Sequence, residues 1–291
     1  MTDINLLDQN NPIIPFTSDY GFKVTFGNES NTVFLRKALQ ALINSPIAIK
    51  EVRFDKNTFD GLTKESKSGI FDMSCIDEMD NHFIVEMQLS GFKFFLQRLK
   101  FYGFQKFNSM IKKGDYSYKG LNKIYSIAIL AANICDLPHH HNIGTVKNQD
   151  GLLMDDQMTF ITVELDKFNK NAESCTSDLD KLIFTMKEAH IINEPTKFPQ
   201  FWTEEWLKIA IKELDTRRLT PDERMAYEMT LSNNAIALYL EKERTEEAVK
   251  EAVKETIKRA LIKGKLSVSE IAEYNNVSIE FVEAVKKEMG I

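Results

Sequence analysis

The stretch that decides the fold runs from Gly69 to Ser90 and reads GIFDMSCIDEMDNHFIVEMQLS. Apolar and polar residues alternate in two runs, one over residues 71–76 and one over residues 83–90. Period-two alternation is the signal of a half-buried strand, and the polar residues 77–82 between the runs are typical of a tight turn. The stretch therefore predicts two antiparallel strands joined as a hairpin.

Each predicted strand carries an acidic residue between apolar neighbours. Asp72 lies on the first strand and Glu86 on the second, and Gln88 shares the strand face of Glu86 because it follows two residues later. Two carboxylates that a hairpin brings together repel each other unless a cation lies between them, and such oxygen ligands select a hard ion such as Mg²⁺. The three residues alone also fit a surface hairpin whose polar side chains face solvent.

The composition is that of an ordinary soluble globular protein. The chain has 291 residues, enough for one large or two modest domains, and 43% of them are hydrophobic and 27% charged. It contains no apolar run long enough for a transmembrane helix, and its first residues lack the basic start and apolar block of a signal peptide. We therefore expect a cytoplasmic protein without a membrane partner.

The cysteines and the net charge indicate which kinds of protein the chain resembles. Cys75, Cys135 and Cys175 are widely spaced and form no CxxC motif, which favours reduced thiols over disulfides or a zinc site. The net charge of −6 argues against a general electrostatic DNA binder. It does not exclude a nuclease, because a local basic surface and a bound metal ion offset the average charge.

Periodicity and capping residues predict the other elements. Residues 1–16 are expected to form an extended lead-in. Helices are expected from the cap at residues 17–19 to Phe26 and over about 32–43, 92–111, 179–189, 202–214 and 221–240, with Lys113-Gly114 as the stop of the third. Strands are expected at 47–54, 123–132 and 158–165, and loops at 55–68 and 133–156.

The hairpin and its flanks resemble a known family. An Asp on one strand followed by Glu-Met-Gln on the next resembles the core of the PD-(D/E)XK nucleases, with Gln88 where the usual motif has lysine. Upstream, SDYGFKVTFG at residues 18–27 resembles the N-terminal motif of the Rpn recombination-promoting nucleases, also called PD-(D/E)XK nuclease family transposases. Downstream, Arg98 and Tyr102, then KGDY at 113–116 and IYSIAIL at 124–130, continue the resemblance.

The resemblance covers residues 15–170 and implies an α/β (α+β) fold with a restriction-endonuclease-like αβββαβ core. An appended helical region is expected at 177–240, and the dense alternating charges of 241–265 predict a solvated helical linker. Residues 266–291 read as a small module of two helices resembling a helix-turn-helix, in which Ser267 and Glu270 form a capping box.

The family implies a magnesium-dependent DNA endonuclease linked to recombination or mobile elements. Asp72 and Glu86 would hold Mg²⁺ with the carbonyl of Met87, and Gln88 would orient the attacking water or contact phosphate without supplying the charge of lysine. Cutting both DNA strands usually needs two active sites, so a homodimer is expected. The alternative is a catalytically degenerate nuclease fold that acts as a DNA- or protein-binding module, which Gln88 and the acidic net charge favour.

Other residues carry two interpretations each. Asp19 is either a supporting acid near the metal or a helix N-cap, and the cap is the favoured interpretation. Arg98 and Tyr102 lie four residues apart on one helix face, where they either bind the DNA backbone or form an arginine lying over a core aromatic ring. No P-loop, GxGxxG or Ser/His/Asp arrangement is present, so no nucleotide cofactor is expected.

The histidines do not form a pattern typical of a metal-binding site. The run His139-His140-His141 is expected in a solvent loop, because three consecutive residues cannot all point at one ion. His82 and His190 have no partner that the sequence identifies, and Cys75 is expected to pack in the core on the face opposite Asp72.

The terminal module favours interaction or oligomerisation over DNA reading. If its second helix read DNA, its first residues would reach the base edges. Those residues include Glu280 and Glu283, and acidic side chains disfavour phosphate and most bases.

Overall fold

The computed structural model describes residues 12–59, 69–89, 94–111, 114, 117–192 and 194–290. Some predicted elements lie outside the described residues. They are the arm before residue 12, most of the loop at 55–68, the start of the helix predicted from residue 92, and Lys113 of its stop. The chain forms two compact units, residues 1–225 and 226–291. Across the described parts of both, no helix has the length and apolar character needed to cross a lipid bilayer.

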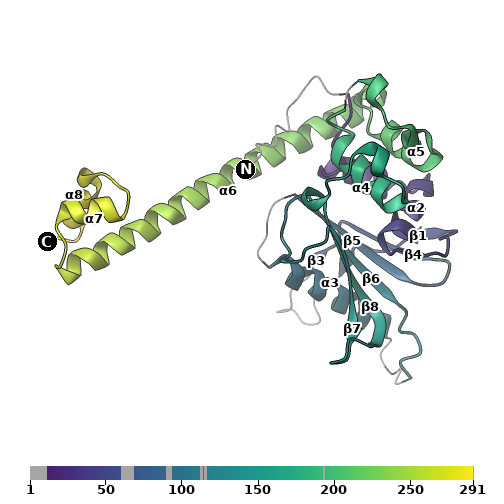
Figure 1. The fold of residues 1–291 in the computed structure, drawn as a ribbon, viewed down its shortest axis with the longest axis horizontal. Helices are drawn as coiled ribbons and strands as arrows, with labels where there is room; N and C mark the ends of the chain where they lie inside the picture. The colour runs from purple at the N-terminus through teal and green to yellow at the C-terminus, as the bar shows by residue number, and fades with distance from the viewer. Residues whose placement is uncertain are drawn as a thin grey trace. The chain divides into compact units, whose positions relative to one another are not determined.

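A six-stranded mixed sheet forms the centre of the first unit, with the strands in the order β1-β4-β5-β6-β8-β7 (Figure 1). These strands are β1 (Val52–Phe54), β4 (Met73–Asp77), β5 (His82–Gln88), β6 (Ile124–Leu130), β7 (His141–Lys147) and β8 (Leu153–Glu164). β4 and β5 form the predicted antiparallel hairpin, and β5, β6 and β8 run parallel to one another. β2 (Thr58–Phe59) and β3 (Gly69–Ile70) pair as a separate two-stranded sheet.

Four helices of this unit pack against one another (Figure 1). They are α1 (Asp19–Phe26), α2 (Val33–Leu42), α4 (Asp178–Glu188) and α5 (Glu205–Glu213). Phe34 of α2 contacts the rings of Phe16, Phe26 and Trp206. Short 3₁₀ turns connect the larger elements at Leu165–Lys167, Ala172–Ser174, Pro195–Lys197, Gln200–Thr203 and Thr216–Arg218.

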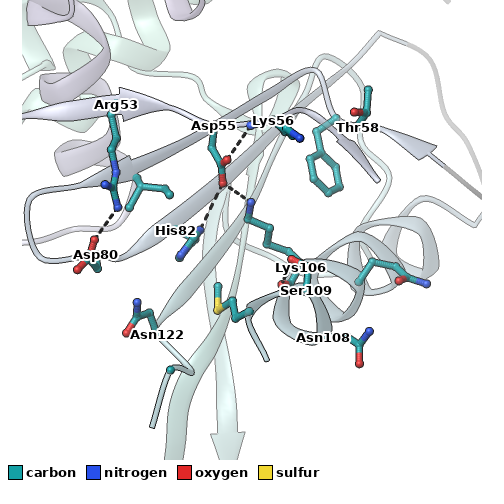
Figure 2. A pocket seen from close by; sticks show the side chains of 15 residues that line it. Arg53, Asp55, Lys56, Thr58, Asp80, His82, Lys106, Asn108, Ser109 and Asn122 are labelled. Carbon is teal, nitrogen blue, oxygen red and sulfur yellow. Dashed lines mark hydrogen bonds and ion pairs between the residues drawn. The ribbon is translucent and has the colours of Figure 1, made fainter. Parts of the chain in front are cut away.

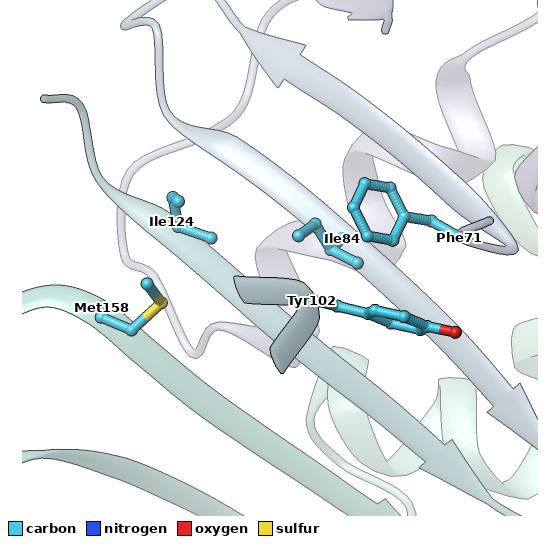
Figure 3. Close-up of a cluster of buried hydrophobic side chains, with 5 residues drawn as sticks. All are labelled: Phe71, Ile84, Tyr102, Ile124 and Met158. Atoms are coloured by element: carbon cyan, nitrogen blue, oxygen red, sulfur yellow. The ribbon is translucent and has the colours of Figure 1, made fainter. Parts of the chain in front are cut away.

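One further helix, α3 (Phe95–Met110), packs directly on β5 and β6. Tyr102 of α3 joins a buried cluster with Phe71, Ile84, Ile124 and Met158 (Figure 3). Gly103 allows the close approach, because a Cβ built there would lie 3.0 Å from the sulfur of Met158. The even-numbered residues of β5 therefore face α3, since side chains alternate along a strand.

The expected αβββαβ order is present as α2, β1, β4, β5, α3 and β6. The fold is a mixed α/β arrangement consistent with a PD-(D/E)XK nuclease. The expected loop at 133–156 was wrong, because β7 and the first third of β8 lie within it. Asp155 and Asp156 interrupt the apolar pattern of β8, whose first residues are mostly exposed, so alternation revealed only its buried half.

The second unit is helical. α6 (Pro221–Lys263) is one continuous helix through the segments expected as an extension and a linker, and α7 (Val268–Tyr274) and α8 (Ile279–Glu288) follow. The capping box of Ser267 and Glu270 is confirmed, and Asn276 turns the chain between α7 and α8 with φ 51°. Ile257 of α6 packs with Ile271 and Val282 in a small apolar core.

We expect Gly21→Ala to destabilise the first unit strongly. A Cβ at residue 21 would lie 2.1 Å from the carbonyl oxygen of Pro15, so the start of α1 would have to move. Overpacking of this kind costs about 1–3 kcal/mol or more, which lowers Tm by several degrees. Gly120→Ala is the matched control, because its Cβ would lie 3.7 Å from the nearest atom, the carbonyl oxygen of Met110. Equal Tm values for the two variants in calorimetry would contradict the expectation.

Candidate active site

Asp72 and Glu86 converge at the end of the β4–β5 hairpin. The register pairs Met73 with Val85, and continuing it by one residue places Asp72 opposite Glu86. The backbone N–H of Asp72 donates to Oε1 of Glu86 at 3.1 Å, and the N–H of Met87 donates to Oδ2 of Asp72 at 2.8 Å. Each carboxylate is thus held by a backbone amide of the neighbouring strand segment, and the two side chains lie next to each other.

The pair extends from solvent into the protein. Asp72 is exposed, whereas Glu86 is 3% exposed and lies beneath α3. Gln88, on the same face of β5, is half-buried. The sequence prediction that Glu86 and Gln88 share a face is confirmed, because both lie next to the same arginine of α3.

Crowding of the two acids changes their protonation. Burial and the nearby charge of Asp72 raise the pKa of Glu86 to about 8, against the opposing effect of the Asp72 N–H and of Arg98. Desolvation by surrounding residues also raises the pKa of Asp72, although the Met87 N–H opposes it. The folded chain therefore places two carboxylates where a bound proton or cation is needed to reduce their mutual repulsion.

Arg98 supplies the nearest positive charge. Its Nη2 donates to Oε1 of Gln88 at 2.8 Å and lies 3.7 Å from Oε2 of Glu86. The guanidinium also lies over the ring of Phe95, 5.0 Å from its centroid. Of the two interpretations of Arg98, the arginine over a core aromatic ring matches this geometry, and the same side chain also contacts the acidic pair.

Tyr102 belongs to the wall of the site. It is 8% exposed, and its ring contacts Phe71 edge to face at 5.2 Å between centroids. Burial raises the pKa of its hydroxyl, and the charge of Glu86 raises it further. Figure 3 shows this oxygen pointing away from the apolar cluster.

Asp19 borders the site but does not cap its helix. Ser18 is the N-cap, because its side chain accepts from the N–H of Gly21 at 3.0 Å, so the favoured cap interpretation of Asp19 was wrong. Asp19 instead pairs with Lys23 at 3.0 Å. Both charges lie close enough to Asp72 to act on its pKa in opposite directions.

The acidic pair fits a divalent cation as two ligands of a larger set. Carboxylate oxygens are the ligands that hard divalent ions prefer, and each carboxylate here keeps one oxygen beyond its backbone hydrogen bond. Within the described ranges, no three His, Cys, Asp or Glu side chains are grouped as a metal site. Backbone carbonyl groups and water would have to complete the coordination.

The histidine run at residues 139–141 is only partly in a loop. His141 begins β7 and its Nε2 lies 2.8 Å from the carbonyl oxygen of Leu42, while His140 packs edge to face on Phe168. His139 is exposed. The expectation of a solvent loop was therefore wrong for His141. Cys75 is fully buried and lies opposite Phe83, on the sheet face away from α3, as expected for core packing.

Sequence reasoning missed a buried acid–base group near the other end of α3. His82 lies 3.8 Å from Asp55, and Lys106 pairs with the same carboxylate. Asp55 and Lys106 are separated by 51 positions in the chain. No periodicity connects residues so far apart, so only the fold reveals the group.

We expect Glu86→Gln to stabilise the metal-free protein at alkaline pH. Folding raises the pKa of Glu86 to about 8, so the folded state keeps a proton that the unfolded state has released. The stability linked to this proton is full below the ordinary glutamate pKa and is lost as pH rises through about 8. Glutamine keeps the side chain uncharged at every pH.

Calorimetry of the metal-free protein at about pH 5 and about pH 9 measures this difference. Glu86→Gln should match the parent at the lower pH and melt about 10 °C higher at the upper pH, because a pKa raised from 4.5 to about 8 corresponds to about 4 kcal/mol between these pH values. The exposed Glu29 provides the control Glu29→Gln, which should not change Tm at either pH. A lower Tm for Glu86→Gln at the upper pH would contradict the assignment of the buried proton.

Comparison with known proteins agrees with this geometry. The family model of the PD-(D/E)XK nuclease family transposases matches residues 16–235, which include the hairpin, α3 and the first turns of α6. Neither a curated protein nor a solved structure matches the chain. Because the family model spans most of its length, the chain belongs to the PD-(D/E)XK nuclease family transposases.

Proposed function

We propose that this protein is a magnesium-dependent endonuclease that hydrolyses phosphodiester bonds of DNA during transposition or recombination. The proposal rests chiefly on the convergence of Asp72 and Glu86. Burial raises the pKa of both carboxyl groups, and the charge of Asp72 raises that of Glu86 further. Family membership supports a nuclease linked to transposition.

In the proposed site, Asp72 and Glu86 would hold the ion together with the carbonyl of Met87. Bound Mg²⁺ would polarise the scissile phosphate and lower the pKa of a water ligand. The backbone amides of Asp72 and Met87 fix both carboxylates before the substrate arrives, so little reorganisation is needed. Asp19, at the start of α1, adds negative charge at the exposed side of the pair.

Arg98 takes the electrostatic role that lysine has in the usual motif. Gln88 cannot supply a positive charge, but its carbonyl oxygen holds the Arg98 guanidinium beside Glu86. A guanidinium stays charged at every physiological pH and binds phosphate oxygens well. We infer that Gln88 and Arg98 together orient the phosphate and stabilise the charge that develops on it.

A second candidate function is a binding module that has lost catalysis. Gln88 in place of lysine favours it, whereas the position of Arg98 favours the enzyme. The terminal unit (α7 and α8) fits an interaction module under either function, and we infer a homodimer because cutting both strands calls for two sites.

Cleavage of supercoiled plasmid tests the metal site directly. Nicked or linear product should form with Mg²⁺ and disappear with EDTA. Asp72→Ala should lower the rate by at least about 100-fold, because the metal contributes several kcal/mol to the transition state. Asp136→Ala, which removes an exposed carboxylate elsewhere in the described chain, should cleave like the parent. Linear product formed without a nicked precursor would support the dimer.

The outcomes separate the two functions. Activity that survives Asp72→Ala would place the reaction at another site. DNA binding without any cleavage would establish the binding module.

Arg98→Met should lower the cleavage rate by about 100-fold, the cost of removing one group that stabilises transition-state charge. Lys100→Met removes an exposed charge from the same helix and is the control. Gln88→Lys should also slow cleavage, because it places an ammonium group beside the guanidinium of Arg98. Faster cleavage by Gln88→Lys would show that lysine alone carries this role. Initial rates on plasmid DNA distinguish these results.

A further inference from the structure

A polar cavity surrounds Asp55, His82 and Lys106 (Figure 2). Its volume is about 820 Å³, within the range of pockets that bind small molecules. Its lining comes from β1, the segment after β1, the start of β5, the second half of α3 and the loop before β6. None of these lining residues holds the proposed metal ion.

The cavity and the candidate site share one helix face and one strand face. Arg98, Tyr102 and Lys106 are spaced four residues apart on α3, so they follow one side of the helix. On β5, His82 and Glu86 lie on the same face because they are an even number of residues apart. Eight residues of helix span about 12 Å, and four residues of strand span about 13 Å.

Phe71 connects the two regions. It lines the cavity, directly precedes Asp72 in the chain and packs against Tyr102. The separation of about 12 Å corresponds to three or four stacked nucleotides of one DNA strand, and to fewer in an extended strand. A nucleotide a few positions from the one at Asp72 and Glu86 would therefore be at the right distance to enter the cavity.

The centre of the cavity has hydrogen-bonding groups of both kinds. Asp55 accepts from the N–H of Lys56 at 2.7 Å and pairs with Lys106, which is 9% exposed (Figure 2). Nδ1 of His82 is buried without a hydrogen-bond partner among the described residues, 3.8 Å from the Asp55 carboxylate. A buried polar atom without a partner costs free energy, so a shift of the imidazole ring towards a ligand in the cavity would add a hydrogen bond.

The wall and rim complete the chemistry. Phe71, Ile76 and Met110 give the cavity an apolar wall. Lys56 is exposed at the rim, and the exposed Arg53 pairs there with Asp80 at 2.7 Å. An apolar wall can pack against the face of a nucleobase, and an imidazole and a carboxylate can hydrogen-bond to its polar edge. Cations at the rim can attract the phosphates. The central carboxylate disfavours a small inorganic anion.

We propose that this cavity binds one unstacked nucleotide of the DNA strand, a few positions from the bond that is cleaved, with His82 and Asp55 contacting the edge of its base. This inference rests on the proposed function, because it takes DNA as the substrate. It adds a specificity site to that function, since Asp55 and His82 accept and donate differently to different bases.

Anisotropy of a short fluorescein-labelled oligonucleotide tests the proposal without cleavage, in EDTA. His82→Leu should weaken binding by about tenfold, the effect of losing one good base contact. His82→Asn keeps a polar atom near the position of Nδ1 and should stay within about threefold of the parent. Lys56→Ala should weaken binding a few-fold, and Lys100→Ala, outside the cavity, should not change it.

An abasic site placed at successive positions of the oligonucleotide locates the contact. The parent should lose about tenfold in affinity at one position and little at the others. His82→Leu should show no preferred position, because its base contact is already lost. The same abasic scan with Asn108→Ala tests an exposed residue at the rim, whose replacement leaves the core packing unaltered. This variant should lose less affinity than the parent at the sensitive position.

Indifference of the parent to the abasic position, or equal binding by the parent and His82→Leu, would overturn the proposal. Neither result depends on catalysis. If the protein does not cut plasmid but one abasic position weakens binding, the proposed nuclease activity is refuted and the nucleotide site is supported. If it cuts plasmid but no abasic position weakens binding, the nuclease activity is supported and the nucleotide site is refuted.

Discussion

The site depends on two reciprocal hydrogen bonds that join the segments of Asp72 and Glu86. Each carboxylate accepts a hydrogen bond from the backbone of the opposite segment, so neither can move away without leaving an amide unpaired. Like charges are thereby forced together at a point where the regular ladder of β4 and β5 ends. Backbone groups of a central sheet, which the core fixes, maintain an arrangement that electrostatics alone would separate.

α3 turns this local arrangement into an extended surface. One face of the helix carries Arg98 beside the acids, Tyr102 over the apolar cluster and Lys106 at the polar cavity. The close packing that Gly103 allows keeps this row near the even-numbered residues of β5. Helix and strand periodicities thus bring charged groups into line along one side of the sheet, and apolar side chains separate the two polar regions.

Much of this was predictable because it depends on short-range pattern. Alternation in residues 69–90 predicted the hairpin and the shared face of Glu86 and Gln88, and the capping box of Ser267 and Glu270 predicted the start of α7. The rest depends on distant contacts. β7 carries Gly144 and exposed apolar residues such as Ile143, so its pairing with β8 leaves little periodicity to detect. The contacts of Arg98 with Gln88, and of Asp55 with Lys106, follow from the packing of α3 on the sheet.

The proton on Glu86 has a consequence for the order of binding. Without a metal ion, a carboxyl group whose pKa is about 8 is mostly neutral at physiological pH, so the pair carries close to one negative charge. Arg98 offsets that charge, and the site then presents little repulsion to a phosphate. In the proposed enzyme, DNA would therefore meet little repulsion before a cation binds, and a cation that bound afterwards would displace the proton of Glu86.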